Sequence, residues 1–91
     1  MVEYHDGLPL FIMNLNEAII KRISEICDKK NMSICDISLK GGMSPSSIYD
    51  LMHKRVKHSK INTIQRFSEG ADMTLGEFFS DPIFDNLEPE D

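Results

Sequence analysis

The chain of 91 residues has no tryptophan, only two cysteines and few aromatic residues. No apolar run approaches the about 20 residues that a membrane-spanning helix requires. The apolar stretch Leu8–Met13 lacks the length and the basic flank of a secretory signal peptide. Cys27 and Cys35 do not have CxxC spacing, so we expect two free thiols that pack in the fold. These absences predict a cytoplasmic protein with no membrane segment.

The length fits one domain, which buries roughly 60–65% of the surface that its unfolded chain exposes. A hydrophobic content of 41% with abundant isoleucine and methionine is ordinary for a helical domain. The sequence therefore predicts an all-α fold around a small core.

The charge is unevenly distributed along the chain. The net charge is −5, but all ten Lys and Arg residues lie between residues 14 and 79, where only eight acids accompany them. Five bases face one acid, Asp50, in the segment from residue 40 to 60: Lys40, Lys54, Arg55, Lys57 and Lys60. A local basic patch on an acidic protein indicates a surface for a polyanion, although a solvated face can produce the same cluster.

Two short helices joined by a glycine turn are predicted between residues 33 and 55. Ser33 and Asp36 have the spacing of a capping box at the start of the first helix. Gly41 and Gly42 end it, since glycine adopts the left-handed conformation without a steric penalty. A turn this short makes the next helix leave at a steep angle.

The next helix is predicted to run from Ser44 to Arg55. Ser44 can cap it, and Pro45 suits the first helical position, where no N–H is needed. Its buried stripe comprises Ile48, Leu51 and Met52. Its outer face comprises Ser46, Ser47, Tyr49, Asp50, His53 and Lys54. An apolar inner stripe with a hydrogen-bonding outer face is what reading of the DNA major groove requires.

Three further helices complete a predicted five-helix bundle. Asn14 and Glu17 begin a helix that ends near Asn31, Ile61 begins the apolar period of another that ends near Gly70, and Thr74–Phe79 forms a last helix of about one and a half turns. The predicted core comprises Ile23, Ile26, Ile37, Ile48, Leu51, Ile64, Phe67, Leu75 and Phe78.

The predicted domain occupies residues 14–80, between an N-terminal extension (1–13) and an acidic C-terminal tail (81–91). Leu8–Met13 is too apolar to stay bare, and we expect it on the bundle or a partner subunit unless Met13 is the true start. Ile83, Phe84 and Leu87 have the spacing of a helical turn, and the last residues are expected to be disordered. Apolar residues at both ends predict a homodimer that buries at least one of these segments.

Five segments from about Ile20 to Phe79 resemble the Cro/repressor-type helix-turn-helix regulators, or XRE family. They are Met32-Ser33, Gly42-Met43-Ser44, the Ser-Ser-Ile-Tyr that follows Pro45, Ile61-Asn-Thr-Ile64 and Thr74-Leu-Gly-Glu-Phe-Phe79. The resemblance implies a compact bundle of the lambda-repressor-like type, a third helix that reads an operator in double-stranded DNA, and a transcriptional regulator, expected to be a repressor and commonly a dimer. It implies no cofactor, metal or small-molecule substrate.

The resemblance also assigns site residues. The base-facing residues are Pro45, Ser46, Tyr49 and Asp50, and the phosphate-contacting residues are Ser44, Ser47, Lys54, Arg55, Lys57 and Lys60. Three positions depart from the family: Ile34 replaces a frequent phosphate-binding glutamine, Ser38 a common alanine, and Asp72 the glycine that ends the fourth helix. Asp50 has three open roles, since it can accept from a cytosine amine, orient Arg55 or Lys54, or lie off the interface.

The sequence favours neither an enzyme nor a zinc-binding protein. Asp50 and His53 would be neighbours on one helix, with two serines close by, but a convex helix without an oxyanion stabiliser does not predict an enzyme. His5, His53 and His58 lack the spacing of a structural zinc site. The alternative is a protein-binding adaptor of the same fold, antirepressor-like or antitoxin-like, which the acidic tail and the missing glutamine would suit.

Overall fold

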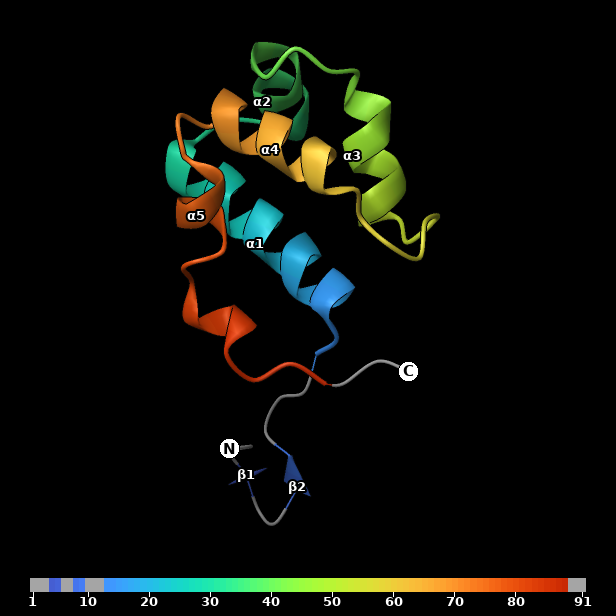
Figure 1. The fold of residues 1–91 in the computed structure, drawn as a ribbon, viewed down its shortest axis with the longest axis vertical. Helices are drawn as coiled ribbons and strands as arrows, with labels where there is room; N and C mark the ends of the chain where they lie inside the picture. Colours follow the sequence, from blue (N-terminus) through green and yellow to red (C-terminus); the bar gives the residue numbers. More distant parts are fainter. Residues whose placement is uncertain (1–3, 6–7, 10–12, 89–91) are drawn as a thin grey trace.

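The computed structural model describes residues 4–5, 8–9 and 13–88 and contains five α-helices (Figure 1). They are α1 (Leu15–Lys30), α2 (Ile34–Lys40), α3 (Pro45–Met52), α4 (Ile61–Gly70) and α5 (Leu75–Phe78), followed by a 3₁₀ turn, η1 (Pro82–Phe84). Two strands of two residues each, β1 (Tyr4–His5) and β2 (Leu8–Pro9), pair antiparallel away from the helices. The predicted all-α bundle of five helices is confirmed. No described helix is long and apolar enough to cross a membrane.

Local side-chain chemistry sets the helix starts, as the sequence predicts. Three helices begin with a complete capping box: Asn14 with Glu17, Ser33 with Asp36, and Thr74 with Glu77. Hydrogen bonds from the backbone and side chain of Thr74 hold the pKa of Glu77 below its ordinary value. A depressed carboxyl pKa contributes stability at neutral pH that is lost as acid protonates the group, so the α5 cap weakens at low pH.

The core lies where α1, α2, α3, α4 and α5 meet. Every predicted core residue is buried there except Leu75, which is half-buried and packs against it. The rings of Phe67 and Phe78 meet edge to face with their centroids 6.3 Å apart. Ile61 begins the apolar period predicted for α4, but it stands at the first position of the helix and its side chain is 61% exposed.

Glycine is required where α2 and α4 cross. A Cβ at Gly41 would collide with the carbonyl oxygen of Arg66, and a Cβ at Gly70 would collide with that of Ile37. The two backbones therefore touch, and this contact fixes where α2 ends. Gly42 follows with a φ of +76°, the left-handed conformation that the glycine turn predicts.

The predicted end of α3 at Arg55 is wrong, because the helix ends at Met52. Lys54 adopts a left-handed φ of +58°, and the amide of Arg55 donates to the carbonyl oxygen of Asp50 at 2.8 Å. This is the bonding pattern of a helix that closes on a left-handed residue. Lys54 and Arg55 therefore lie in the turn that leaves α3. Similarly, α5 is one turn long and does not include Phe79.

The first part of the acidic tail packs on the bundle. Phe84 lies 6.1 Å from Phe78 and 5.0 Å from Phe79, measured between ring centroids. The amide of Glu88 donates to the carbonyl oxygen of Met13 at 2.7 Å. The helical turn expected near residue 83 is present as η1. The expectations for residues 10–12 of the apolar stretch and for the last three residues lie outside the described residues.

Two buried serines give a matched test of core polarity. Ser38 and Ser68 are both fully buried, but only the Ser68 hydroxyl has an acceptor, the carbonyl oxygen of Ile64 at 2.8 Å. Within the described chain the Ser38 hydroxyl has no hydrogen-bond partner. We predict that Ser38→Ala raises the free energy of unfolding by about 1 kcal/mol, because it removes an unpaired buried hydroxyl and adds helix propensity. Urea unfolding should show no such gain for Ser68→Ala, and equal effects of the two substitutions would contradict the prediction.

Candidate nucleic-acid interface

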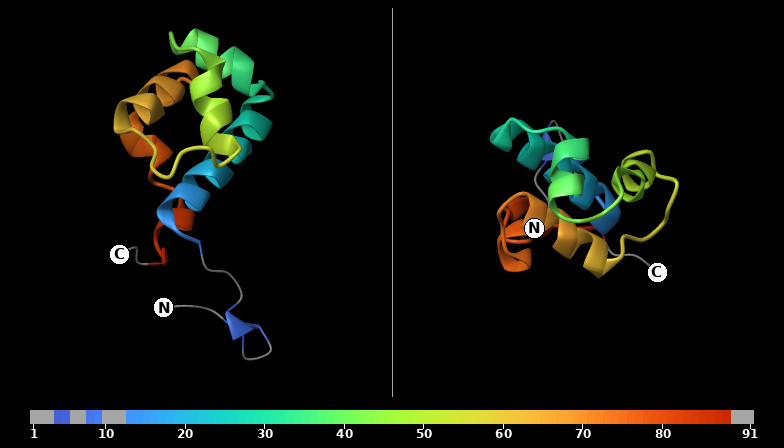
Figure 2. Two further views of the ribbon diagram at one scale, coloured as in Figure 1. Left: turned by 90° about the vertical axis from the view of Figure 1, so that its right-hand side faces the viewer. Right: turned by 90° about the horizontal axis from the view of Figure 1, so that it is seen from above.

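The helix α3 lies on the outside of the bundle. In the left view of Figure 2 it faces the viewer, with α4 to its left and α2 to its right. Its inner stripe is buried, since Ile48 is fully enclosed and Leu51 is 2% exposed. Its opposite face is polar. Ser46, Ser47 and Tyr49 are exposed there, and Pro45 and Asp50 are half-buried. All four residues assigned to base contact therefore have part of their surface open to solvent.

The start of α3 is closed by its own serines. The Ser44 hydroxyl accepts from the amide of Ser46 at 3.4 Å, and the two hydroxyl oxygens lie 2.9 Å apart. Pro45 occupies the first helical position, as predicted. Ser44 and Ser46 are both exposed, so their hydroxyls can also reach a ligand at this end of the helix.

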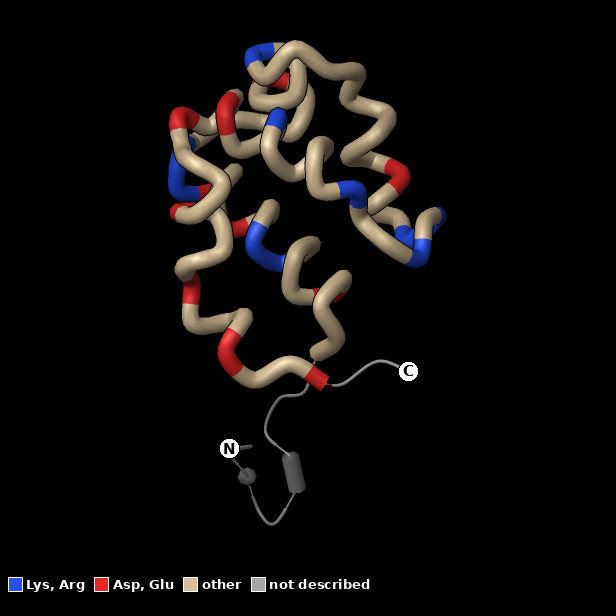
Figure 3. The backbone as a smooth tube through the Cα atoms, viewed as in Figure 1, with Lys and Arg blue, Asp and Glu red and all other residues tan. Residues whose placement is uncertain are grey.

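The loop between α3 and α4 carries the four cations that were assigned to phosphates, and it lies apart from the acidic tail (Figure 3). Two of these cations have carboxylate partners. Lys54 Nζ lies 3.8 Å from Glu17 Oε2, and Arg55 Nη1 lies 3.1 Å from Asp50 Oδ1. In the described part of the chain the other two, Lys57 and Lys60, have no ion-pair partner.

Lys60 stands at an unusual place for a lysine. It is the N-cap residue of α4, and no side chain caps that helix. Serine, threonine, aspartate and asparagine are preferred at this position, and a cation is disfavoured by the positive end of the helix dipole. An anion near the start of α4 would interact favourably with both the N-terminal end of the helix and the lysine.

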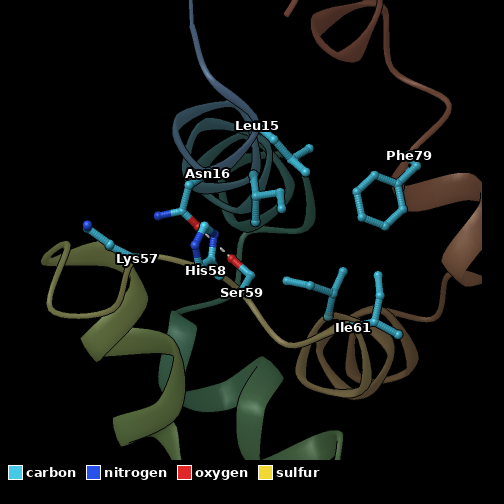
Figure 4. Close-up of a pocket in the computed structure, with 9 residues that line it drawn as sticks. Leu15, Asn16, Lys57, His58, Ser59, Ile61 and Phe79 are labelled. Atoms are coloured by element: carbon cyan, nitrogen blue, oxygen red, sulfur yellow. Dashed lines mark hydrogen bonds between the residues drawn. The ribbon is translucent and has the colours of Figure 1, made fainter. Parts of the chain in front are cut away.

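The loop is tied to the first turn of α1. The Ser59 hydroxyl donates to Asn16 Oδ1 at 2.7 Å (Figure 4). The contact between Lys54 and Glu17 joins the same two segments. Both ends of the loop therefore lie next to the first turn of α1.

An apolar groove of about 250 Å³ lies behind the loop. Leu15 and Ile61 form its exposed edges, at 45% and 61% exposure, and Phe79 lines its far side (Figure 4). Lys57 also lines the groove, but the nitrogen end of its side chain points away from Phe79 and Ile61 (Figure 4). The groove is smaller than the about 300–1,000 Å³ of typical cofactor pockets, and it suits a few side chains of another protein. Its exposed edges were not predicted from the sequence.

Two more contacts of cations were not predicted from the sequence. Arg66 Nη1 donates to the carbonyl oxygen of Gly42 at 3.1 Å, so an exposed cation of α4 supports the turn before α3. Lys40 Nζ lies 2.7 Å from Asp72 Oδ2 and lowers the pKa of that carboxyl group. Lys40 is therefore drawn toward the end of α4. Asp72 has a φ of +60°, the conformation that glycine would adopt there.

Of the two other departures from the family pattern, Ser38 leaves a buried hydroxyl without a hydrogen-bond partner among the described residues, whereas Ile34 contributes to packing. Ile34 is half-buried and packs against the core.

Cys27 and Cys35 are free and half-buried, and burial raises the pKa of the Cys27 thiol, which keeps it protonated. Among the described residues no three His, Cys, Asp or Glu side chains gather in a way that could hold a metal ion.

Comparison of the chain with protein-family models and with curated proteins finds no match.

Proposed function

We propose that this protein is a sequence-specific DNA-binding transcriptional regulator of the lambda-repressor-like type, in which α2 and α3 form the helix-turn-helix and α3 enters the major groove. The observation that carries the proposal is the exposed polar face of α3 beside Lys57 and Lys60, which have no ion-pair partner among the described residues. A single helix fits the major groove, where each base pair presents a distinct pattern of donors and acceptors. Bound at an operator, such a protein would act as a repressor.

The roles follow from the places of the residues. Ser46, Tyr49 and Asp50 offer hydroxyls and a carboxylate to base edges, and Pro45 offers an apolar contact to a thymine methyl group. The phosphate contacts come from Ser44 and Ser47 on α3 and from Lys54, Arg55, Lys57 and Lys60 in the loop. The three described acids of the tail, Asp81, Asp85 and Glu88, lie away from this loop (Figure 3). Salt screens exposed charges that are farther apart than about 8–10 Å, so distant acids oppose binding at the loop less than nearby ones.

We further propose that the protein binds DNA as a homodimer. The apolar residue Phe84 of the tail does not support the predicted homodimer, since it packs on Phe78 and Phe79 of its own chain. The exposed edges of the groove, Leu15 and Ile61, supply an apolar contact for a second copy instead. A two-fold dimer places two recognition helices about 34 Å apart, so its operator should be a palindrome with half-sites one helical turn apart.

Selection of an operator from a random DNA library, followed by titration of variants, tests the function. We expect Tyr49→Ala to cost about 1–3 kcal/mol on the selected operator and much less on a scrambled duplex, because a base contact is lost. Lys57→Gln should weaken binding to both duplexes and lower the salt slope by about one unit, because a phosphate contact is lost.

Three outcomes would contradict this account. Equal losses for the Tyr49 and Lys57 variants on both duplexes would show that α3 does not read bases. A selected operator without two-fold symmetry would contradict the dimer. If the wild-type chain binds neither duplex, the protein-binding adaptor takes the place of the DNA-binding regulator, and the exposed apolar groove is the observation that favours it.

A further inference from the structure

The carboxylates that pair with Lys54 and Arg55 differ in where they stand. Glu17 is on α1. Its Oε2 meets Lys54, and its other carboxylate oxygen, Oε1, accepts from the amide of Asn14 at 3.2 Å as part of a capping box. Asp50 is on α3, one helical turn after Ser46 and on the face that is open to solvent. Of the two, only Asp50 can meet both a loop cation and a base in the major groove.

The backbone brings Asp50 and Arg55 together without help from the rest of the fold. The amide of Arg55 donates to the carbonyl oxygen of Asp50 at 2.8 Å, and the left-handed Lys54 turns the chain back toward α3. The side chains then meet at 3.1 Å. The pair is therefore closed in the free protein.

This pair can open at low cost. The side chains of Arg55 and Asp50 are 64% and 45% exposed, and exposed ion pairs contribute little to stability. DNA would offer each of them a new partner. A phosphate, like a carboxylate, forms a charge-assisted and often bidentate pair with a guanidinium group, and the exocyclic amine of cytosine is a donor for a carboxylate.

We propose that Asp50 determines specificity by exchanging partners, an inference that rests on the proposed DNA-binding function. On the operator, the Asp50 carboxylate accepts from a cytosine amine, and Arg55 is released to a backbone phosphate. Where guanine or thymine, which present only acceptors or a methyl group in the groove, lies beside Asp50, the carboxylate finds no donor, the pair stays closed, and Arg55 adds no phosphate contact. The base contact of Asp50 and the phosphate contact of Arg55 are thereby linked, which raises the ratio of operator affinity to random-DNA affinity.

The test is Asp50→Ala, measured on the selected operator and on a scrambled duplex at salt concentrations from 50 to 200 mM. On scrambled DNA the freed Arg55 should steepen the salt slope by about one unit, which is about a 3.5-fold larger change in affinity over that range. On the operator the preference for cytosine at one position should be lost. The specificity ratio should therefore fall.

Two matched variants separate the exchange from simple loss of a negative charge. Glu17→Gln keeps the capping side chain and frees Lys54, but Glu17 cannot reach a base, so binding to both duplexes should strengthen by the same factor. In an Arg55→Gln background, Asp50→Ala should no longer steepen the salt slope on scrambled DNA.

The failures can be told apart. If Asp50→Ala strengthens binding to both duplexes by one factor, as Glu17→Gln should, Asp50 acts only through its charge and the exchange is overturned while the DNA-binding function stands. If the wild-type chain binds neither duplex at any salt concentration, the proposed function and the exchange fall together.

Discussion

Replacing Arg22 by methionine should lower the free energy of unfolding by about 3 kcal/mol. Arg22 is only 8% exposed, and its Nε and Nη2 donate to the carbonyl oxygens of Phe78 and Glu77 at 2.8 and 3.0 Å. A third nitrogen, Nη1, lies 3.3 Å from Asp81 Oδ2. Methionine has a similar length but leaves the Phe78 carbonyl oxygen and one carboxylate oxygen of Asp81 without the Arg22 donor, while the Glu77 carbonyl oxygen keeps the Ser80 hydroxyl at 2.9 Å.

Urea denaturation at neutral pH measures this effect. Arg66→Met is the matched control, because the same substitution there removes one hydrogen bond from an exposed arginine to Gly42. We expect a loss of less than about 1 kcal/mol for the control. Equal losses for the two variants would show that Arg22 does not join η1 and α5 to the bundle.

Replacing Lys60 by aspartate should make the protein more stable and impair DNA binding. Aspartate is a preferred N-cap residue and complements the helix dipole, so the free energy of unfolding should rise by about 1 kcal/mol. Reversal of a charge beside the DNA backbone should weaken binding to any duplex by roughly 10- to 100-fold at low salt. A residue that lowers stability where it stands, but is needed for binding, is typical of a functional site.

Lys57→Asp provides the control for this prediction. It reverses a charge in the same loop but does not lie at a helix cap, so it should weaken DNA binding to a similar degree without raising stability. Thermal unfolding and DNA titration of both variants check the two effects separately. A Lys60→Asp protein that binds DNA normally would contradict the assignment of this residue to phosphates.

Helix starts could be predicted because their signals are local. A serine or asparagine followed three residues later by an acid, as at Asn14 and Ser33, specifies a capping box whatever the rest of the chain does. The end of α3 has no comparable signal. Lys54 takes a left-handed conformation there, at a position where glycine is usual. Since no glycine marks the position, the end of α3 could not be predicted from the sequence.

Contacts between distant segments could not be predicted. Glu17 and Lys54 are far apart in the chain, and only the fold places the start of α1 beside the loop. The same is true of Arg22, whose acceptors lie in α5. Ile61 shows the related limit of a periodic pattern, which identifies the inner face of α4 but not how far the bundle covers it. The residues proposed for DNA contact were predictable as an outer face, whereas their ion pairs were not.

The central claim is that α3 and the loop after it contact DNA, and nuclear magnetic resonance of the labelled protein tests it most directly. A short duplex of random sequence is added at 50 mM salt, where contacts to the phosphate backbone alone give measurable binding. The account predicts that amide signals of Ser46, Tyr49, Lys57 and Lys60 shift and return as the salt concentration is raised. Shifts confined to Leu15, Ile61 and Phe79 around the groove, or no shift at all, would contradict it.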